Sequence, residues 1–237
     1  MPPPICRTVD LGTIDYRQAW DLQVELSQAV HDGKQPNTLL LLEHPHVYTQ
    51  GRLSQQEHLL LNENQLAERG IDLVETDRGG QITYHGPGQL VAYPVVNLRD
   101  WGGPLKYVRT LEQIIIQSLS SFGITAGLVE GLTGVWIGDR KIAAIGVKIS
   151  RGVAHHGFSI NVNNDLSYFD HIVPCGITDR RVTSMQQILG QQIVGDVIDP
   201  AAVRYGVAYH FGQGMGFTMV EEPETSLWAS SPLVGED

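Results

Sequence analysis

Apolar residues near the start of the chain recur with a helical period. Between residues 15 and 31 they form one loose face, made of Tyr16, Ala19, Trp20, Leu26 and Val30. Asp15 is a residue type that caps helix starts, with Gln18 three positions later, and Gly33 suits a helix end. The spacing therefore predicts a helix over residues 15 to 31.

Three segments carry the apolar runs of strands. Residues 38 to 42 (TLLLL) predict a buried strand, and residues 72 to 76 predict another. The near-continuous apolar run QLVAYPVVNL, from 89 to 98, is typical of a central strand. Pro94 lies inside this run, and because proline cannot donate to a ladder it favours a bulge or a sheet edge.

Three further helices are expected. From Pro104 to Phe122 apolar residues step by three or four, with Gly123 at the end, so this segment predicts a helix with one buried face. A short helix is expected to begin at Thr183 or Ser184. Asp199 and Pro200 are expected to start another, which runs to about residue 211.

The remaining pattern predicts a hairpin and sets the fold class. Residues 134 to 150 predict two strands that turn at Gly138 to Arg140, and residues 155 to 163 predict a further strand. This order of elements predicts one α+β domain over residues 1 to 220, with a mixed, mostly antiparallel sheet flanked by helices. Residues 221 to 237 are rich in Glu, Pro and Ser and predict a loose acidic tail.

Composition narrows the class of protein. Hydrophobic residues make up 42% of the chain and charged residues 18%, as in ordinary globular domains. No segment approaches the roughly 18 consecutive apolar residues of a membrane span, and the start shows no export signal, so we expect a cytoplasmic protein. A net charge of -10 disfavours a nucleic-acid partner. Residues 136 to 185 nevertheless carry six basic and four acidic side chains, which fits docking of an acidic partner or simply scattered solvated charge.

The densest cluster of candidate binding groups is DRGGQITYHGPGQLVAYP, residues 77 to 94. Glycines let the backbone approach a ligand closely, and Arg78, His85 and Gln89 add polar groups, although a turn-rich connection would look similar. The chain lacks G-x-x-x-x-G-K-[ST] and G-x-G-x-x-G, which argues against a nucleotide loop. HPH at 44 to 46 and HH at 155 and 156 lack known metal-ligand spacing, so no metal site is expected.

Cys175 is the candidate nucleophile. It lies between a proline and a glycine, and Cys6 is the one other cysteine of the sequence. A free thiol has a pKa of about 8.5, so it needs a nearby cation or helix start to become a thiolate at neutral pH. Spacing alone cannot bring Lys141 to Cys175, so from the residues alone a small apolar side chain filling a turn remains an alternative.

Four motifs together resemble the lipoate-protein octanoyltransferase family. They are RGGQITYHGPGQLVAYP, GDRKIAAIGVKIS, HHGFSINVN and VPCGI, and they occur in the family's order with the lysine 34 positions before the cysteine. The similarity runs from about residue 38 to 189, and the first 36 residues and those after about 212 match weakly. His46 departs from the family, which commonly shows a second proline there.

The resemblance implies roles for particular residues. Cys175 would carry the acyl chain as a thioester, and Lys141 would lower the pKa of that thiol and move protons. Beside this catalytic pair, the resemblance implies fifteen substrate-binding residues. They are Arg78, Gly79, Gly80, Gln81, Ile82, Thr83, Tyr84, His85, Tyr93, Ala144, Ile145, Gly146, Gly157, Phe158 and Ser159. The fold implied is that of biotin and lipoate protein ligases.

The implied reaction is a ping-pong octanoyl transfer that needs no cofactor. The donor would be octanoyl-acyl carrier protein. The acceptors would be apo lipoyl domains of 2-oxoacid dehydrogenase E2 subunits and the glycine cleavage H protein. Three alternatives stay open at this point: an ATP-dependent lipoate or biotin ligase, a non-catalytic module that binds acyl groups or lipoyl domains, and a cysteine hydrolase.

Overall fold

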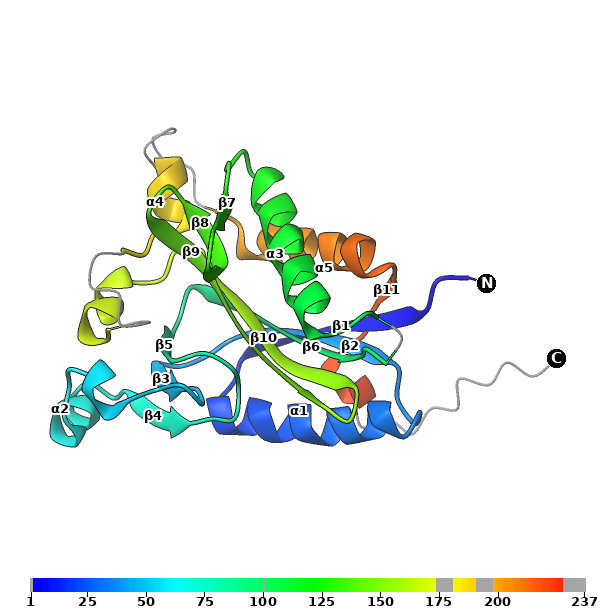
Figure 1. Ribbon diagram of the computed structural model, residues 1–237, viewed down its shortest axis with the longest axis horizontal. Coiled ribbons are helices and arrows are strands. Elements are labelled where there is room, and N and C mark those ends of the chain that lie inside the picture. The colour runs from blue at the N-terminus through cyan, green and yellow to red at the C-terminus, as the bar shows by residue number, and fades with distance from the viewer. Residues whose placement is uncertain (1, 100, 174–180, 191–197, 228–237) are drawn as a thin grey trace.

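A mixed eight-stranded sheet forms the centre of the molecule, in the order β11-β1-β2-β6-β10-β9-β8-β7 (Figure 1). The computed structural model describes residues 2 to 99, 101 to 173, 181 to 190 and 198 to 227. The strands of this sheet are β1 (Ile5–Thr13), β2 (Asn37–Glu43), β6 (Gln89–Asn97), β7 (Gly127–Val129), β8 (Leu132–Ile137), β9 (Arg140–Ser150), β10 (Val153–Asn161) and β11 (Thr218–Glu221). Strand β1 runs parallel to β2 and β11, and the other neighbours are antiparallel, which confirms the predicted mixed, mostly antiparallel sheet.

A second, three-stranded sheet lies beside the first, at the lower left of Figure 1. It has the order β4-β3-β5, from β3 (Val47–Gln50), β4 (Asp72–Glu75) and β5 (Ile82–His85). The helix α2 (Glu63–Glu68) and the 3-10 turns η1 (Gln56–His58) and η2 (Leu166–His171) flank it. Tyr48 and Tyr84, both fully buried, give this sheet an apolar core of its own.

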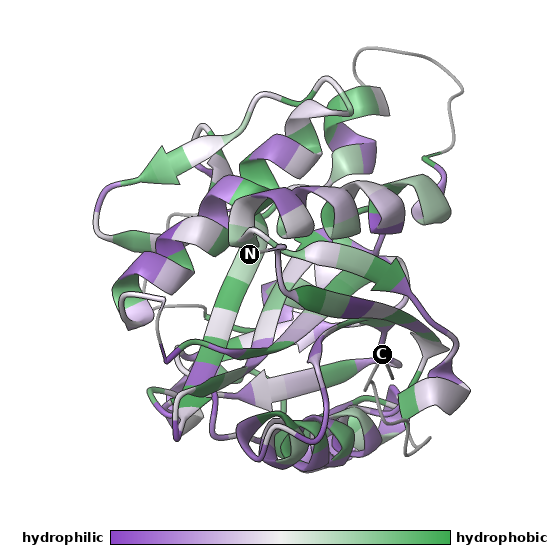
Figure 2. Cartoon of the chain, turned by 90° about the vertical axis from the view of Figure 1, so that its right-hand side faces the viewer, coloured by the Kyte–Doolittle hydropathy of each residue, from purple (hydrophilic) through white to green (hydrophobic). Residues whose placement is uncertain are grey.

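Helices cover both faces of the large sheet. Helix α1 (Tyr16–His31) packs on one face, whereas α3 (Pro104–Ser120) and α5 (Pro200–Met215) pack on the other (Figure 1). Figure 2 shows hydrophilic and hydrophobic residues alternating around these helices, as expected where one face of a helix is buried. The short helix α4 (Met185–Gly190) lies beside the end of β10, where Gln186 donates its backbone N–H to the carbonyl of Val162.

Burial on both faces explains the continuous apolar strands. In β2, Leu39 and Leu41 contact the α3/α5 layer, and Leu40 and Leu42 contact the α1 layer. Successive side chains of a strand point to opposite faces, so a strand covered on both sides needs apolar residues at every position. The TLLLL run predicted as a buried strand is therefore confirmed.

The predicted helices are present, and three of them begin at the expected caps. The Asp15 carboxylate accepts hydrogen bonds from two backbone N–H groups at the start of α1. Pro104 begins α3, and Asp199 caps α5. Helix α5 continues to Met215, about one turn beyond the prediction, because the left-handed residue that ends it is Gly216, with φ 70°.

The apolar run around Pro94 forms a central strand, as predicted, so of the two alternatives given for Pro94 the sheet edge is wrong. Strand β6 lies between β2 and β10, and Pro94 pairs with Leu39 of β2. On its other side, β6 pairs with β10 up to Ala154 and again from Phe158, in the same register, and the pairing is interrupted between these residues. The stretch between contains His156, whose φ is 54°. The sheet thus accommodates the missing N–H of proline by a local irregularity in the neighbouring strand.

Residues 218 to 227 are ordered, although a loose tail was expected from 221. Strand β11 ends at Glu221, and the 3-10 turn η4 (Glu224–Leu227) places Leu227 in the α1 layer, only 3% exposed. Two partners of the buried Arg7 come from this segment: its Nη1 donates to the carbonyl of Ser226 (3.4 Å) and lies 3.6 Å from Glu222 Oε2. Residues 228 to 237 of the expected tail lie outside the described residues.

Five strands were not predicted: β1, β3, β5, β7 and β11. Four of them are only three or four residues long, and β1 contains polar residues whose partners are distant in sequence. Arg7 of β1, for example, donates to Thr38 Oγ1 (3.3 Å) of the neighbouring strand. Within the described ranges, no helix combines the length and the apolar character that crossing a bilayer requires.

Replacing Gly157 with alanine should destabilise the sheet strongly. A Cβ atom at this position would overlap the carbonyl oxygen of Ala92 and lie 2.6 Å from Cδ of Pro94, so β6 and β10 would have to separate. We expect a loss of about 3 kcal/mol in the free energy of unfolding, measured in urea. Gly127→Ala, in strand β7 with open space around it, is the control and should change stability by less than about 0.5 kcal/mol. Equal stability of the two variants would contradict this account.

Candidate active site

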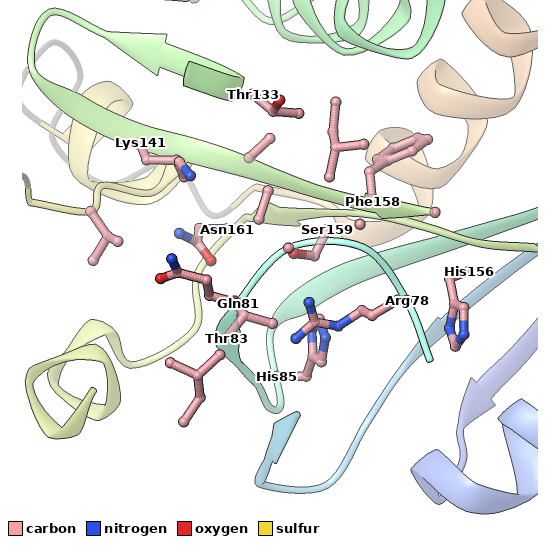
Figure 3. A pocket seen from close by; sticks show the side chains of 18 of the residues that line it. Arg78, Gln81, Thr83, His85, Thr133, Lys141, His156, Phe158, Ser159 and Asn161 are labelled. Carbon is pink, nitrogen blue, oxygen red and sulfur yellow. The ribbon is translucent and has the colours of Figure 1, made fainter. Parts of the chain in front are cut away.

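A pocket lies where the large sheet meets the three-stranded sheet. It has a volume of about 280 Å³ and mostly apolar walls, a size at the lower end for small-molecule sites (Figure 3). Most of its lining residues come from three stretches: Arg78, Gly80, Gln81, Ile82, Thr83, His85, Gln89 and Tyr93; Gly131, Leu132, Thr133, Trp136, Lys141, Ala143, Ala144, Ile145 and Gly146; and His156, Gly157, Phe158, Ser159, Asn161 and Phe169. The others are Tyr16, Leu53, Arg181 and Val182.

One wall is a ladder of small residues. Antiparallel pairing of β9 with β10 places Ala144 opposite Ser159 and Gly146 opposite Gly157. Because these side chains are short or absent, the two strands leave room above the sheet. All six residues expected to contact substrate on these strands line the pocket, Ile145 and Phe158 included.

The opposite wall is the glycine-rich segment, which Arg78 ties to the small sheet. Its guanidinium donates to Thr49 Oγ1 (2.7 Å) and to the Thr49 carbonyl (2.6 Å), and also to the carbonyl of Gly79 (3.0 Å). The Gly79 N–H donates to Val147 of β9 (3.0 Å). Arg78 is only 7% exposed, so these bonds fix both the loop and a positive charge beside the cavity.

Two residues expected at the substrate do not line this pocket. Gly79 holds the loop to β9 through its backbone. Tyr84 is fully buried on the other side of β5, where its hydroxyl lies 2.8 Å from Nδ1 of His46 and its ring stacks on Tyr168. Thr83 and His85 line the pocket, and Tyr84 between them points to the opposite face of β5. Ile82 packs in the same cluster as Tyr84 but also lines the pocket.

A buried polar network joins the glycine-rich segment to β10. His85 Nδ1 lies 2.7 Å from Gln89 Oε1, and because an amide oxygen only accepts, this nitrogen carries the hydrogen. The Gln89 amide donates to Asn161 Oδ1 (2.9 Å), and Asn161 donates to the carbonyl of Thr183 (3.0 Å). Burial lowers the pKa of His85 to about 3, so the ring is neutral. Asn161 was not among the residues predicted for the site.

Lys141 lies at one end of the pocket, and its backbone is fixed by the segment after residue 180. Its N–H donates to Arg181 and its carbonyl accepts from Thr183, both at 2.9 Å. Its ammonium lies 4.8 Å from the centre of the Trp136 ring. Figure 3 shows Lys141 and His156 at opposite ends of the cavity.

Cys175 lies outside the described residues, as does the rest of the segment 174 to 180. Arg181 and Val182, which follow that segment, line the cavity, as does Phe169 before it. Val173, directly before the segment, donates its N–H to the carbonyl of His58 (2.9 Å).

His44 supports the pocket from behind, a role that the sequence analysis missed. Its Nδ1 lies 2.7 Å from the carbonyl of Ile14, so this nitrogen carries the hydrogen. Its Nε2 therefore accepts from the hydroxyl of Tyr93 (2.8 Å), which lines the pocket. Burial lowers the pKa of His44 to about 4.

The comparisons with known proteins are consistent in family and fold. The model of the lipoyl protein ligase A/B catalytic domain matches residues 15 to 205. An octanoyltransferase of Solibacter usitatus is 48% identical over 95% of this chain and 99% of its own length. A bi-partite lipoate protein ligase of Thermoplasma acidophilum superposes with a TM-score of 0.71, at 18% identity, over 94% of this chain and 90% of the other. A biotin protein ligase of Aquifex aeolicus superposes with a TM-score of 0.55, at 16% identity, over 89% and 70%. The expected ligase-type fold is thereby confirmed.

His44→Asn should make the protein less sensitive to acid. The unfolded chain binds a proton at residue 44 below about pH 6.5, whereas the folded chain does so only near pH 4, so stability falls as the pH drops between these values. Asparagine keeps a donor for Ile14 but does not titrate. We expect the loss of stability between pH 6.5 and 5 to shrink by up to about 1.4 kcal/mol per pH unit, measured by urea unfolding. An unchanged dependence on pH would show that His44 does not stay neutral.

Proposed function

This chain belongs to the lipoyl protein ligase A/B catalytic domain family and is an octanoyltransferase, and we propose that it carries the octanoyl group as a thioester on Cys175. The observation that supports this most is the position of Lys141. Its side chain lies at an apolar pocket, and its backbone is hydrogen-bonded on both sides to the chain that returns from the Cys175 segment. Lys141 thus lies at the cavity together with Arg181 and Val182, which follow the expected thiol segment in the chain.

In the first half-reaction, Cys175 takes the octanoyl group from a carrier thioester. The ammonium of Lys141 favours the thiolate, because an opposite charge nearby lowers the pKa of a thiol. The thiolate sulfur attacks the carbonyl carbon, a new carbon–sulfur bond forms, and the bond to the carrier sulfur breaks. The departing carrier thiolate takes a proton from Lys141.

In the second half-reaction, a lysine amine of an apo lipoyl domain attacks the thioester on Cys175. A carbon–nitrogen bond forms, the carbon–sulfur bond breaks, and the product is an amide. The amine loses a proton, which Lys141 accepts, so the dyad returns to its starting state. The energy of the thioester drives amide formation, so the reaction needs no ATP.

The small-residue wall accommodates the acyl chain. In this proposal the octanoyl group lies along Ala144, Gly146 and Gly157, where short side chains leave the apolar space. Arg78 and His85 form part of the opposite wall. Gly79 and Tyr84 lie behind that wall, where Gly79 holds the glycine-rich loop and Tyr84 holds β5 in place.

The partners follow from the same chemistry. We propose octanoyl-acyl carrier protein as the donor, and as acceptors the apo lipoyl domains of 2-oxoacid dehydrogenase E2 subunits and the glycine cleavage H protein, in the cytoplasm. Carrier proteins of this kind are acidic, and Arg181 lines the pocket near Lys141, while Arg140 precedes Lys141 in β9. Lys148 is less suited to docking, because it pairs with Asp77 at 2.5 Å.

Octanoyl-carrier without an acceptor should add one octanoyl group to Cys175. Intact mass spectrometry measures the addition, and hydroxylamine should remove it. Cys6 is the matched control within the chain, because it is fully buried and burial raises the pKa of its thiol to about 12. The modified peptide should contain Cys175 and never Cys6, and Cys175→Ala should abolish labelling. An unmodified mass in the wild-type chain would refute the acyl-enzyme.

Lys141→Ala should slow both half-reactions by about 10²-fold or more, because it removes the proton carrier and the charge that favours the thiolate. The rate of Cys175 alkylation should also reach its plateau at a higher pH. Lys106→Ala is the control, since Lys106 likewise lies over a tryptophan ring, 4.9 Å from the centre of Trp101, but on α3 away from the pocket. If both variants alkylate with the wild-type pH profile, Lys141 does not tune the thiol.

A further inference from the structure

Three potential metal ligands meet at the end of the pocket opposite Lys141. Asp77, His155 and His156 each offer one donor atom, and these atoms all lie within 4.8 Å of one another. His155 is 4% exposed and His156 is 1% exposed. Figure 3 places His156 far from Lys141, beside Arg78, so this cluster is separate from Lys141.

The backbone brings both imidazoles to one side of β10. Consecutive residues of a strand normally point to opposite faces of the sheet. His156 instead has φ 54°, in the left-handed region that non-glycine residues rarely adopt. Its N–H donates to Gln23 Oε1 of α1 (2.7 Å), which holds this conformation. Such strain is retained where the surrounding structure requires it, often at functional sites.

The two histidines have unsatisfied nitrogens. Among the described residues, neither ring nitrogen of His155 has a hydrogen-bond partner, and neither does Nδ1 of His156. Buried polar atoms are almost always paired with protein, water or an ion, because an unpaired one is costly. His156 Nε2 lies 2.8 Å from Asp77 Oδ1, which orients both groups within the cluster. Each imidazole can offer one nitrogen to a metal ion, so the unpaired ring of His155, next to His156 and the Asp77 carboxylate, points to a cation as a missing partner.

We propose that Asp77, His155 and His156 bind a zinc ion, with water completing the coordination. Two imidazoles and one carboxylate are a donor set that zinc uses in proteins, with a fourth position left to water. Bound there, zinc would join the start of the glycine-rich segment to β10 and fix the far end of the pocket. The site binds zinc whether or not the chain transfers octanoyl groups.

Two positive groups oppose a cation at this position. Lys148 Nζ lies 2.5 Å from Asp77 Oδ2, and Arg78 follows Asp77 in the chain. Zinc therefore has to displace Lys148 from the carboxylate. This competition makes a specific prediction, because removing the ammonium of Lys148 should strengthen zinc binding.

The test is calorimetric titration of the full chain with zinc chloride. It uses the Cys175→Ala background, so that the reactive thiol contributes no ligand. We expect one zinc per chain, with His155→Ala and Asp77→Asn weakening binding at least 10-fold and Lys148→Met strengthening it several-fold. A zinc-dependent change in the fluorescence of Trp20, whose ring centre lies 5.8 Å from that of His156, gives an independent readout.

His210→Ala is the matched control, because His210 lies on α5, where its Nε2 is 2.8 Å from Ser121 Oγ. It should bind zinc as the parent does. If His155→Ala fails to fold, Asp77→Asn decides, since asparagine keeps an oxygen for His156 but loses the charge. The absence of binding at 100-fold molar excess, or equal affinity in the parent and Asp77→Asn chains, would overturn the proposal.

Discussion

The antiparallel pairing of β9 with β10 is the constraint on which the site depends. It places Gly146 opposite Gly157 and thereby creates the apolar space of the pocket. Near the start of the same strand, the backbone of Lys141 is hydrogen-bonded to Arg181 and Thr183. Strand β9 therefore sets both the small-residue wall of the pocket and the position of Lys141. Gly157 in turn approaches β6 so closely that only hydrogen fits, which couples the pocket to the centre of the sheet.

The long elements were predictable because each carries its own signal. Helix α1 has a capping aspartate and a periodic apolar face, and β2 has an unbroken apolar run. Strands β1 and β11 lack such a signal, because their stability comes from parallel pairing with each other and from the buried Arg7, whose partners are distant in sequence. The effect of Pro94 could not be predicted for a related reason. The irregularity that accommodates this proline lies in the neighbouring strand, at His156.

The sequence motifs of the candidate site could be predicted, but the hydrogen bonds that hold its residues in place could not. The glycine-rich segment and the β9 and β10 residues are recognisable in the sequence, and most of them line one cavity. Gln89, Asn161 and His44 hold those residues in place through bonds between side chains that no local pattern reveals. Adjacent histidines also carry no metal-binding spacing, because the third donor, Asp77, is 78 residues before His155 and the left-handed turn at His156 is invisible in the sequence.

The position of β11 has a consequence for synthesis of the protein. Strand β1 is synthesised long before residues 218 to 227, yet its outer edge pairs with β11, and Arg7, beside its bond to Thr38, has two of its partners in that later segment. An open strand edge readily pairs with other chains. The nascent chain therefore exposes this edge of β1 until residues 218 to 227 have been made, and the sheet cannot close before then.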